Sequence, residues 1–133
     1  MEIREYIDSD LSSLNILLND VYGIEKVNCI TDNVELVAIE DEAVVGYLMI
    51  NIMHDSIKNI GYCMVNYVCV DKGHRRQGIA TKLFEKVFDI CRNKNISYIE
   101  LTSNETRVEA HALYKKIGFM VRDTTVFRKE FLW

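Results

Sequence analysis

The stretch "VCVDKGHRRQGIATKLFEKV", residues 68–87, joins an apolar run to an amphipathic one through a polar and basic loop. The run that ends at Val70 is typical of a buried strand, and apolar residues after the loop recur at helical spacing. We predict a helix that starts at Gln77 and turns one apolar stripe toward the sheet. The stripe consists of Ala80, Leu83, Phe84, Val87, Phe88 and Cys91.

The start of this predicted helix suits an anion. The first-turn N–H groups of a helix have no partner within it, and the helix dipole is positive there. Gly78 and Ala80 are small enough for a phosphate to approach the backbone, and Arg75 and Arg76 add positive charge. The residues alone also allow a solvated basic loop in which Gly78 only eases the turn. Neither GxxxxGK[ST] nor GxGxxG spacing is present.

The rest of the chain alternates strands and helices. Gly23 is placed to end a helix, Asp41 and Glu42 indicate a tight hairpin, and Gly46 marks a bulge or a close backbone approach. Residues 24–33 form either a loop or a short helix. Together these elements predict one α/β domain on a mixed sheet, residues 1–133. Strands are expected over 2–7, 34–40, 43–53, 60–70, 97–103 and 124–131, and two further helices over 8–23 and 107–116.

Composition excludes several classes of protein. The chain has 133 residues, a formal net charge of −4 and 27% charged residues, which argues against disorder and against general nucleic-acid binding. No apolar run approaches the ~20 residues that cross a bilayer, and the N-terminus does not resemble a signal peptide, so we expect a cytoplasmic protein that binds no membrane. The cysteines lack CxxC spacing and His54, His74 and His111 are scattered, so we expect reduced core thiols and no metal. The cysteines are Cys29, Cys63, Cys69 and Cys91.

A second motif, "AHALYKKIGF" at residues 110–119, follows after one predicted strand. With Arg75-x-x-Gly78-x-Ala80 it resembles the GNAT family of N-acetyltransferases, whose acetyl-CoA motif reads Arg/Gln-x-x-Gly-x-Gly/Ala. The resemblance covers nearly the whole chain. It implies a mixed, mainly antiparallel sheet of six to seven strands with about four helices. It also implies that the fourth and fifth strands splay apart and admit the cofactor.

The resemblance further implies which residues bind the cofactor. A bulge in the fourth strand would free amides near 67–70 for the pantetheine arm and the acetyl carbonyl, and amides near 75–81 would hold the pyrophosphate. Many relatives carry asparagine at the place of Arg107, which either reaches the phosphates or covers its own helix turn. The expected cofactor-binding residues are Val68, Cys69, Val70, Arg75, Arg76, Gln77, Gly78, Ile79, Ala80, Thr81, Asn104 and Arg107.

Tyr114 is the candidate catalytic residue. It shares a helical stripe with Leu113 and Ile117, so by spacing alone it could be a core residue with a solvated tip. The resemblance implies instead that it is the general acid for the coenzyme A sulfur. Proton transfer from a phenol of pKa about 10 to a thiolate of pKa about 8.5 is uphill by about 2 kcal/mol, so we expect it to donate a strong hydrogen bond. His111 is its neighbour on the helix surface, with a structural or cofactor-adjacent role.

The general base and the acceptor stay open. Glu100 is one candidate base, Asn66 or Tyr67 could order a water, and His54 with Asp55 could flank the acceptor slot. The acceptor is expected to be a small-molecule or peptide amine, and the mildly acidic surface favours a cationic one. The segments expected to shape its pocket are 20–33, 54–59 and 123–126.

Three functions are therefore weighed. The first is transfer of an acetyl group from acetyl-CoA to a primary amine by direct attack through a tetrahedral intermediate. The second is a non-catalytic acyl-CoA-binding regulatory module, which would have no need of Tyr114. The third is an interaction protein whose basic loop binds an acidic partner. A homodimer is compatible with the apolar ending "FLW", residues 131–133.

Overall fold

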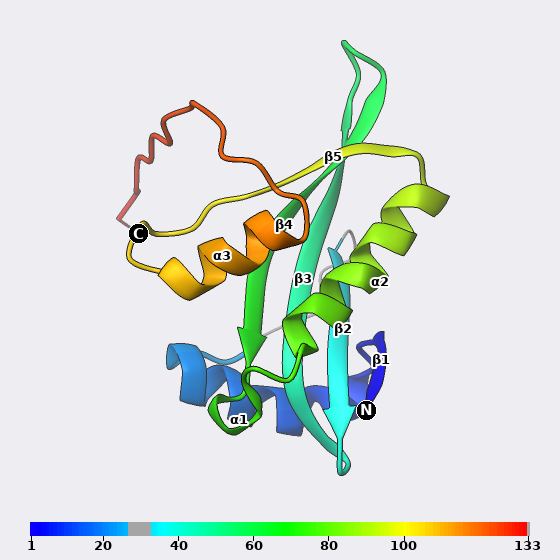
Figure 1. Cartoon of the computed structure of the whole chain (residues 1–133), viewed down its shortest axis with the longest axis vertical. Coiled ribbons are helices and arrows are strands. Elements are labelled where there is room, and N and C mark those ends of the chain that lie inside the picture. The colour runs from blue at the N-terminus through cyan, green and yellow to red at the C-terminus, as the bar shows by residue number, and fades with distance from the viewer. Residues whose placement is uncertain (27–32, 133) are drawn as a thin grey trace. The chain divides into compact units, whose positions relative to one another are not determined.

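The computed structural model describes residues 1–26 and 33–132, in two compact units, Met1–Thr102 and Ser103–Trp133. The first unit holds a five-stranded sheet with a helix on each face, and the second holds α3, Val108–Lys116 (Figure 1). The elements of the first unit are β1 (Glu2–Glu5), η1 (Asp8–Asp10), α1 (Leu11–Tyr22), β2 (Asn33–Glu40), β3 (Ala43–Asp55), β4 (Ile60–Val70), η2 (Lys72–His74), α2 (Ile79–Asn93) and β5 (Ile96–Leu101).

The sheet has the order β1-β2-β3-β4-β5. All neighbouring pairs are antiparallel except β4–β5, which is parallel. The β2–β3 hairpin turns at Asp41 and Glu42, whose φ angles of 50° and 63° lie in the left-handed region that two-residue hairpins favour. The predicted hairpin and the mixed, mainly antiparallel sheet are therefore confirmed.

The strand count differs from the prediction. The described residues form five strands rather than six to seven, and no strand forms over 124–131. A strand needs a partner for its backbone groups, and the local sequence alone does not supply one. Val126 and Phe127 are consecutive and are 69% and 91% exposed, so this segment lacks the alternation of a half-buried strand. In the ambiguous segment 24–33, residues 24–26 are neither helix nor strand, Asn33 begins β2, and 27–32 lie outside the described residues.

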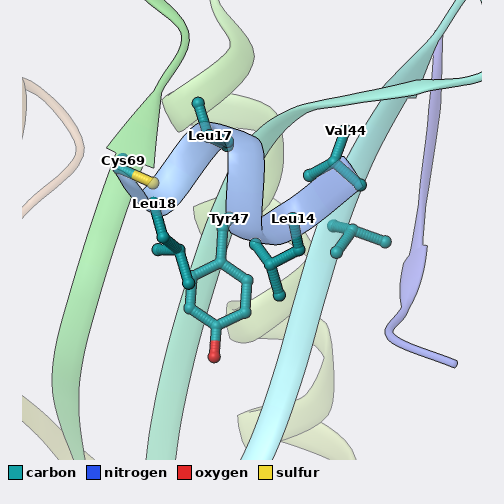
Figure 2. Packing of buried hydrophobic residues seen from close by; sticks show 7 residues of the cluster. Leu14, Leu17, Leu18, Val44, Tyr47 and Cys69 are labelled. Atoms are coloured by element: carbon teal, nitrogen blue, oxygen red, sulfur yellow. The ribbon is translucent and has the colours of Figure 1, made fainter. Parts of the chain in front are cut away.

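Helix α1 packs on one face of the sheet. Leu14, Leu17 and Leu18 are buried against side chains of β2, β3 and β4, and Tyr47 and Cys69 meet them from the sheet (Figure 2). Gly23 ends the helix at a φ of 67°, and its N–H donates to the carbonyl of Asn19 at 2.9 Å. The predicted helix stop is confirmed, and the spacing of the leucines accounts for the face that α1 buries.

Helix α2 packs on the opposite face, very close to β3. A Cβ atom at Gly46 would lie 2.7 Å from Cγ2 of Ile79 and 3.3 Å from Cδ1 of Leu83, so any side chain there would force a neighbour to shift. The β2–β3 register also shifts next to this glycine, at Val45. Both features predicted for Gly46, a bulge and a close backbone approach, are confirmed at this position.

The start of α2 is two residues later than predicted. Gly78 is the N-cap at a left-handed φ of 76°, and Ile79 begins the helix. This start turns Ile79 inward, where it is 2% exposed, while Ala80 and Phe88 are only partly buried. The buried stripe therefore consists of Ile79, Leu83, Phe84, Val87 and Cys91.

The described cysteines are reduced, buried thiols, as predicted. Cys63, Cys69 and Cys91 are free, and burial raises the pKa of Cys63 and Cys69 to about 12. These thiols are therefore neutral at pH 7. Cys29 lies outside the described residues. Within the described ranges, none of the helices has the length and apolar character needed to cross a bilayer.

Asp10 stabilises the junction of β1 and α1. Its carboxylate accepts two hydrogen bonds of 2.7 Å from Arg4 and one of 2.9 Å from the N–H of Ile7. The hydrogen bond from Arg4 chiefly lowers the pKa of Asp10, although burial opposes it. We expect Asp10→Asn to lower the free energy of unfolding at pH 7 by about 1–3 kcal/mol.

The difference between wild type and Asp10→Asn is also expected to depend on pH. A carboxyl with a lowered folded-state pKa contributes stability above its unfolded pKa of about 3.9, and loses it as the pH falls through the folded value. Urea unfolding from pH 7 to pH 2.5 (about the lower practical limit) measures this. A difference that stays constant over that range would contradict the assignment.

Candidate active site

Strands β4 and β5 separate midway along β4. Their register runs only from Gly61 with Ile96 to Val65 with Leu101. The remaining residues of β4, up to Val70, extend past the end of β5. The predicted splay is confirmed, and it leaves one edge of β4 without a strand partner among the described residues.

A bulge lies where the two strands separate. The β3–β4 register passes from Met49 with Tyr67 to Ile50 with Val65, so Asn66 is an extra residue in β4. The insertion changes which side chains face which helix. Before it, the Cys63 thiol lies 3.9 Å from that of Cys91 in α2. After it, the Tyr67 ring meets Tyr22 of α1 edge-on at 5.8 Å and Cys69 belongs to the buried core against α1.

The main chain of Val68 and Val70 faces the gap. The carbonyl of Val68 accepts a 2.7 Å hydrogen bond from the Tyr22 hydroxyl, and that of Val70 accepts one of 3.4 Å from Nε of Arg75. In an antiparallel strand the main-chain N–H and C=O of one residue point to the same side, and the next residue points its own to the opposite side. The main-chain groups of Cys69, which lies between Val68 and Val70, therefore point toward β3. Of the three strand residues expected at the cofactor, Val68 and Val70 are thus placed to offer main-chain groups, and Cys69 is not.

The loop after β4 is held by Asp71. Its carboxylate accepts a hydrogen bond of 3.1 Å from the N–H of Gly73 and lies 2.7 Å from Nδ1 of His74. The contact with His74 chiefly lowers the pKa of Asp71, which is therefore an anion at neutral pH. This closed turn presents the following basic residues beside the start of α2.

The first turn of α2 is open to an anion. Gly78 makes no side-chain cap, and the first helical hydrogen bond runs from the N–H of Lys82 to the carbonyl of Gly78 at 3.0 Å. The N–H groups of residues 79–81 consequently have no partner within the helix. Arg75 and Arg76 precede this turn and are exposed, and Gln77 lies exposed between them and Gly78. The arrangement has the positive charge and the open amides that a phosphate requires.

A cavity of about 160 Å³ lies on the α1 face of the sheet. Tyr67, which follows the bulge, forms part of its wall, so the cavity adjoins the gap between β4 and β5. Its wall combines charged, amide, aromatic and thioether groups, among them Lys26, Asn33, Glu35, Tyr47 and Met49. Polar and apolar groups both line it, and its volume is below the roughly 300–1,000 Å³ of pockets for drug-sized ligands, so it suits a smaller ligand.

The second unit carries the other predicted site residues. Asn104 accepts two hydrogen bonds of 2.9 Å from the N–H and hydroxyl of Thr106, and exposed Arg107 is the N-cap of α3. Tyr114 is 8% exposed and its ring meets that of Phe119 edge-on at 5.9 Å. Burial raises the pKa of Tyr114, and the charge of Arg107 opposes the rise only in part, so the phenol is protonated at neutral pH.

The comparison with known sequences now decides the family. The sequence model of the Acetyltransferase (GNAT) family matches residues 6–119. The chain belongs to the GNAT family. The match includes the β4–α2 junction and α3, which carry the motifs Arg75-x-x-Gly78-x-Ala80 and "AHALYKKIGF".

Individual relatives agree with this assignment. The chain is 30% identical to human N-acetyltransferase 8 over 115 residues, covering 86% of this chain and 48% of the relative. It is 30% identical over 95 residues to the L-amino acid N-acetyltransferase AaaT of Escherichia coli K12, covering 68% of this chain and 55% of the relative. The chain thus spans about half the length of these relatives.

A solved acetyltransferase structure shares the fold. The aminoglycoside N-acetyltransferase AAC(6')-Iy, solved in complex with CoA, superposes with a TM-score of 0.82 at 16% identity, covering 98% of this chain and 100% of that one. At this level of identity the likeness establishes the fold. It confirms the mixed sheet predicted from the sequence.

The candidate general bases of this GNAT chain differ in how far they lie from the bulge in β4. Glu100 is exposed and pairs with Met64, one register position before the last β4–β5 pair, so it stays a candidate. His54 and Asp55 are the last residues of β3 rather than loop residues, and His54 pairs with Gly61. That position is five residues from the bulge, or ~17 Å at ~3.3 Å per residue.

Asp55 also has a structural role of its own. Its carboxylate accepts hydrogen bonds of 2.9 and 3.0 Å from the N–H groups of Ile57 and Lys58, so it stabilises the β3–β4 turn. We therefore drop His54 and Asp55 as residues of the acceptor slot. Within the described ranges, no three His, Cys, Asp or Glu side chains are grouped to hold a metal ion.

Two polar features on the α1 face were not predicted. One is a row of hydrogen-bonded carboxamides across three strands, in which Asn66 donates to Asn51 and Asn51 donates to Asn33. The other is buried Glu35, which is 9% exposed. The sequence did hold a signal for Glu35, because alternation places it on the same strand face as the apolar Val37. A charge on a buried face is the less common case and deserves a functional explanation.

Proposed function

We propose that this GNAT chain transfers an acetyl group from acetyl-CoA to a primary amine, by direct attack through a tetrahedral intermediate. One observation carries the proposal: β4 leaves β5 at the Asn66 bulge, beside an uncapped helix start flanked by Arg75 and Arg76. The names of two relatives, N-acetyltransferase 8 and the L-amino acid N-acetyltransferase AaaT, and the CoA complex of one similar fold support it.

The residues present fit acetyl-CoA, which supplies the activated acetyl thioester. Gly78 has no Cβ to obstruct a phosphate, and the N–H groups of Ile79, Ala80 and Thr81 have no partner within the helix. Val68 and Val70 offer main-chain groups along the open edge of β4 for the amide-bearing pantetheine arm. The full set proposed for the cofactor is Val68, Val70, Arg75, Arg76, Gln77, Gly78, Ile79, Ala80, Thr81, Asn104 and Arg107.

The proposed chemistry has three parts. The amine enters from the cavity on the α1 face, and a main-chain N–H at the bulge donates to the oxyanion. Tyr114 donates a hydrogen bond to the departing sulfur. Because burial raises the pKa of Tyr114 further above that of a thiol, partial donation is favoured over complete proton transfer. Glu100, or a water held by Asn66, accepts the proton of the amine.

The finer assignments belong to the same proposal. We take residues 1–133 as one N-acetyltransferase domain, because the family match crosses both compact units. A cytoplasmic location fits the buried thiols of Cys63 and Cys91, whose Sγ atoms are in hydrogen-bond contact at 3.9 Å and form no disulfide. The acceptor is a small-molecule or peptide amine, and a homodimer is one form in which the chain would act.

A melting experiment tests cofactor binding. Acetyl-CoA at about 100 times its Kd is expected to stabilise the chain by about 2.7 kcal/mol, which raises Tm by several degrees. The double variant Arg75→Ala, Arg76→Ala should lose most of this shift. Arg92→Ala is the matched control, since Arg92 is an exposed arginine that pairs with Asp89 at the far end of α2.

Release of free thiol in the presence of a panel of amines then separates the enzyme from the non-catalytic acyl-CoA-binding module. Turnover with any amine supports the enzyme. A clear shift in Tm without turnover by any amine favours the regulatory module, and no shift for wild type contradicts both.

A further inference from the structure

Glu35 is a buried carboxylate in the wall of the α1-face cavity. Strand β2 places it on the face that α1 covers, and its side chain is 8% exposed. The hydroxyl of Tyr47 donates to Oε1 of Glu35, and the N–H of Tyr6 donates to its main-chain carbonyl at 2.9 Å. The carboxylate is therefore rigidly held in a site of low dielectric, where its attraction for a cation is strong.

An alkylammonium already sits at this carboxylate. Nζ of Lys26 lies 2.9 Å from Oε1 and 3.1 Å from Oε2 of Glu35, and 5.0 Å from the centre of the Tyr6 ring. A carboxylate together with an aromatic face is the usual recognition geometry for an ammonium group. Lys26 thus shows, with a group of the chain itself, that the wall accepts an alkylammonium.

A contribution to stability does not by itself explain the buried ion pair of Lys26 and Glu35. Removing two charges from water costs several kcal/mol, and well-packed apolar residues in the same place are commonly as stable or more so. The pair also lines a cavity instead of filling the core. Its position in a small-molecule pocket points to recognition.

The charge and size of the cavity restrict which ligands can bind in it. The charged residues of its described lining are two glutamates, Glu25 and Glu35, and one lysine, Lys26, which leaves one net negative charge. The volume of about 160 Å³ compares with the cavity of about 150 Å³ that takes up benzene. A four-carbon diamine has as many non-hydrogen atoms as benzene. The cavity thus has room and charge for a short diamine.

The path from Glu35 to the gap is polar. Tyr67, which follows the bulge, lines the same cavity as Glu35. The carboxamides of Asn66, Asn51 and Asn33 form a hydrogen-bonded row from the bulge to the cavity wall. A diamine in the cavity would have hydrogen-bond acceptors along its length and its free amine directed to the gap.

We propose that Glu35 makes the acceptor pocket selective for amines that carry a second ammonium group, and that Lys26 occupies the ammonium position when no acceptor is bound. The inference rests on the proposed function, because it takes the cavity as the acceptor site. Glu35 binds the distal ammonium, and the substrate replaces Lys26 there. The substrate class is a short aliphatic diamine or a larger amine with an equivalent second cation.

Calorimetric binding in the presence of saturating CoA tests this without turnover. The probes are 1,4-diaminobutane and butylamine, which differ by one ammonium group. Wild type should bind the diamine more tightly, and Glu35→Gln should weaken diamine binding at least about tenfold while changing butylamine binding less than about threefold. Lys26→Gln should strengthen diamine binding severalfold, since it removes the competing ammonium. This rise cannot come from damage to the fold.

Two further variants serve as controls for this experiment. The double variant Lys26→Met, Glu35→Met removes the charges together and is expected to fold, and its preference for the diamine should be gone. Glu85→Gln, an exposed change of the same chemistry in α2, should alter neither affinity. Equal losses for both probes in Glu35→Gln, or weaker diamine binding in Lys26→Gln, would overturn the inference. Failure of CoA itself to bind would contradict the proposed function instead.

Discussion

Replacement of Tyr114 by phenylalanine is expected to lower kcat for acetyl transfer about 10- to 100-fold. The change removes one hydrogen bond to a developing thiolate, worth about 1.5–3 kcal/mol, and leaves the ring in place. The ring packs edge-on against Phe119 at 5.9 Å, so the variant should fold. Thiol release measures kcat, and titration with acetyl-CoA should give a Kd within about twofold of wild type.

The pH profile sharpens this prediction. Because burial raises the pKa of Tyr114, the phenol keeps its proton at every pH below about 10. The ratio of wild-type to Tyr114→Phe activity should therefore stay constant between about pH 7 and 9. Tyr62→Phe is the matched control, since Tyr62 stacks on Tyr98 at 5.1 Å well before the bulge. Unchanged turnover in Tyr114→Phe would refute the assigned role and leave Tyr114 as a packing residue.

Replacement of Gly46 by alanine is expected to destabilise the chain and to weaken acetyl-CoA binding together. The new Cβ would lie 2.7 Å from Cγ2 of Ile79, a methyl group bonded directly to Cβ and so held close to the backbone of α2, and the helix must shift. Such overpacking costs about 1–3 kcal/mol. Because Ile79 is the first residue of α2, the shift moves the amides proposed to hold the pyrophosphate, and the Kd should rise several-fold.

Gly61→Ala is a close control for this variant. Gly61 is also a strand glycine, and a Cβ there would lie 2.9 Å from Cδ1 of Ile96, the tip of a flexible side chain that can turn away. We expect Gly61→Ala to cost less than about 1 kcal/mol and to leave acetyl-CoA binding unchanged. Urea unfolding and cofactor titration give both quantities. Equal losses in the two variants would show that the contact with α2 is not the cause.

The sequence by itself determined the local elements of this protein. The leucine spacing of α1, its stop at Gly23, the hairpin at Asp41 and Glu42 and the strand–loop–helix unit around Gly78 all follow from periodicity and turn chemistry. Such signals act between residues that are near neighbours in the chain. The GNAT resemblance, carried by two motifs, extended them to the splayed sheet, which the β4–β5 register confirms.

The tertiary structure alone decided which groups face the site. The bulge at Asn66 changes the alternation of β4, so that Val68 and Val70 face the gap while Cys69 packs against α1. The strand predicted over 124–131 does not form, since pairing depends on a partner elsewhere in the chain.

The cavity on the α1 face likewise depends on the tertiary structure. Glu35, Lys26 and Tyr47 come from separate parts of the chain, and only the folded sheet brings the carboxylate, the ammonium and the hydroxyl together. No local spacing encodes that meeting. Register and burial arise from contacts between residues distant in sequence, and these contacts set the chemistry of the pocket.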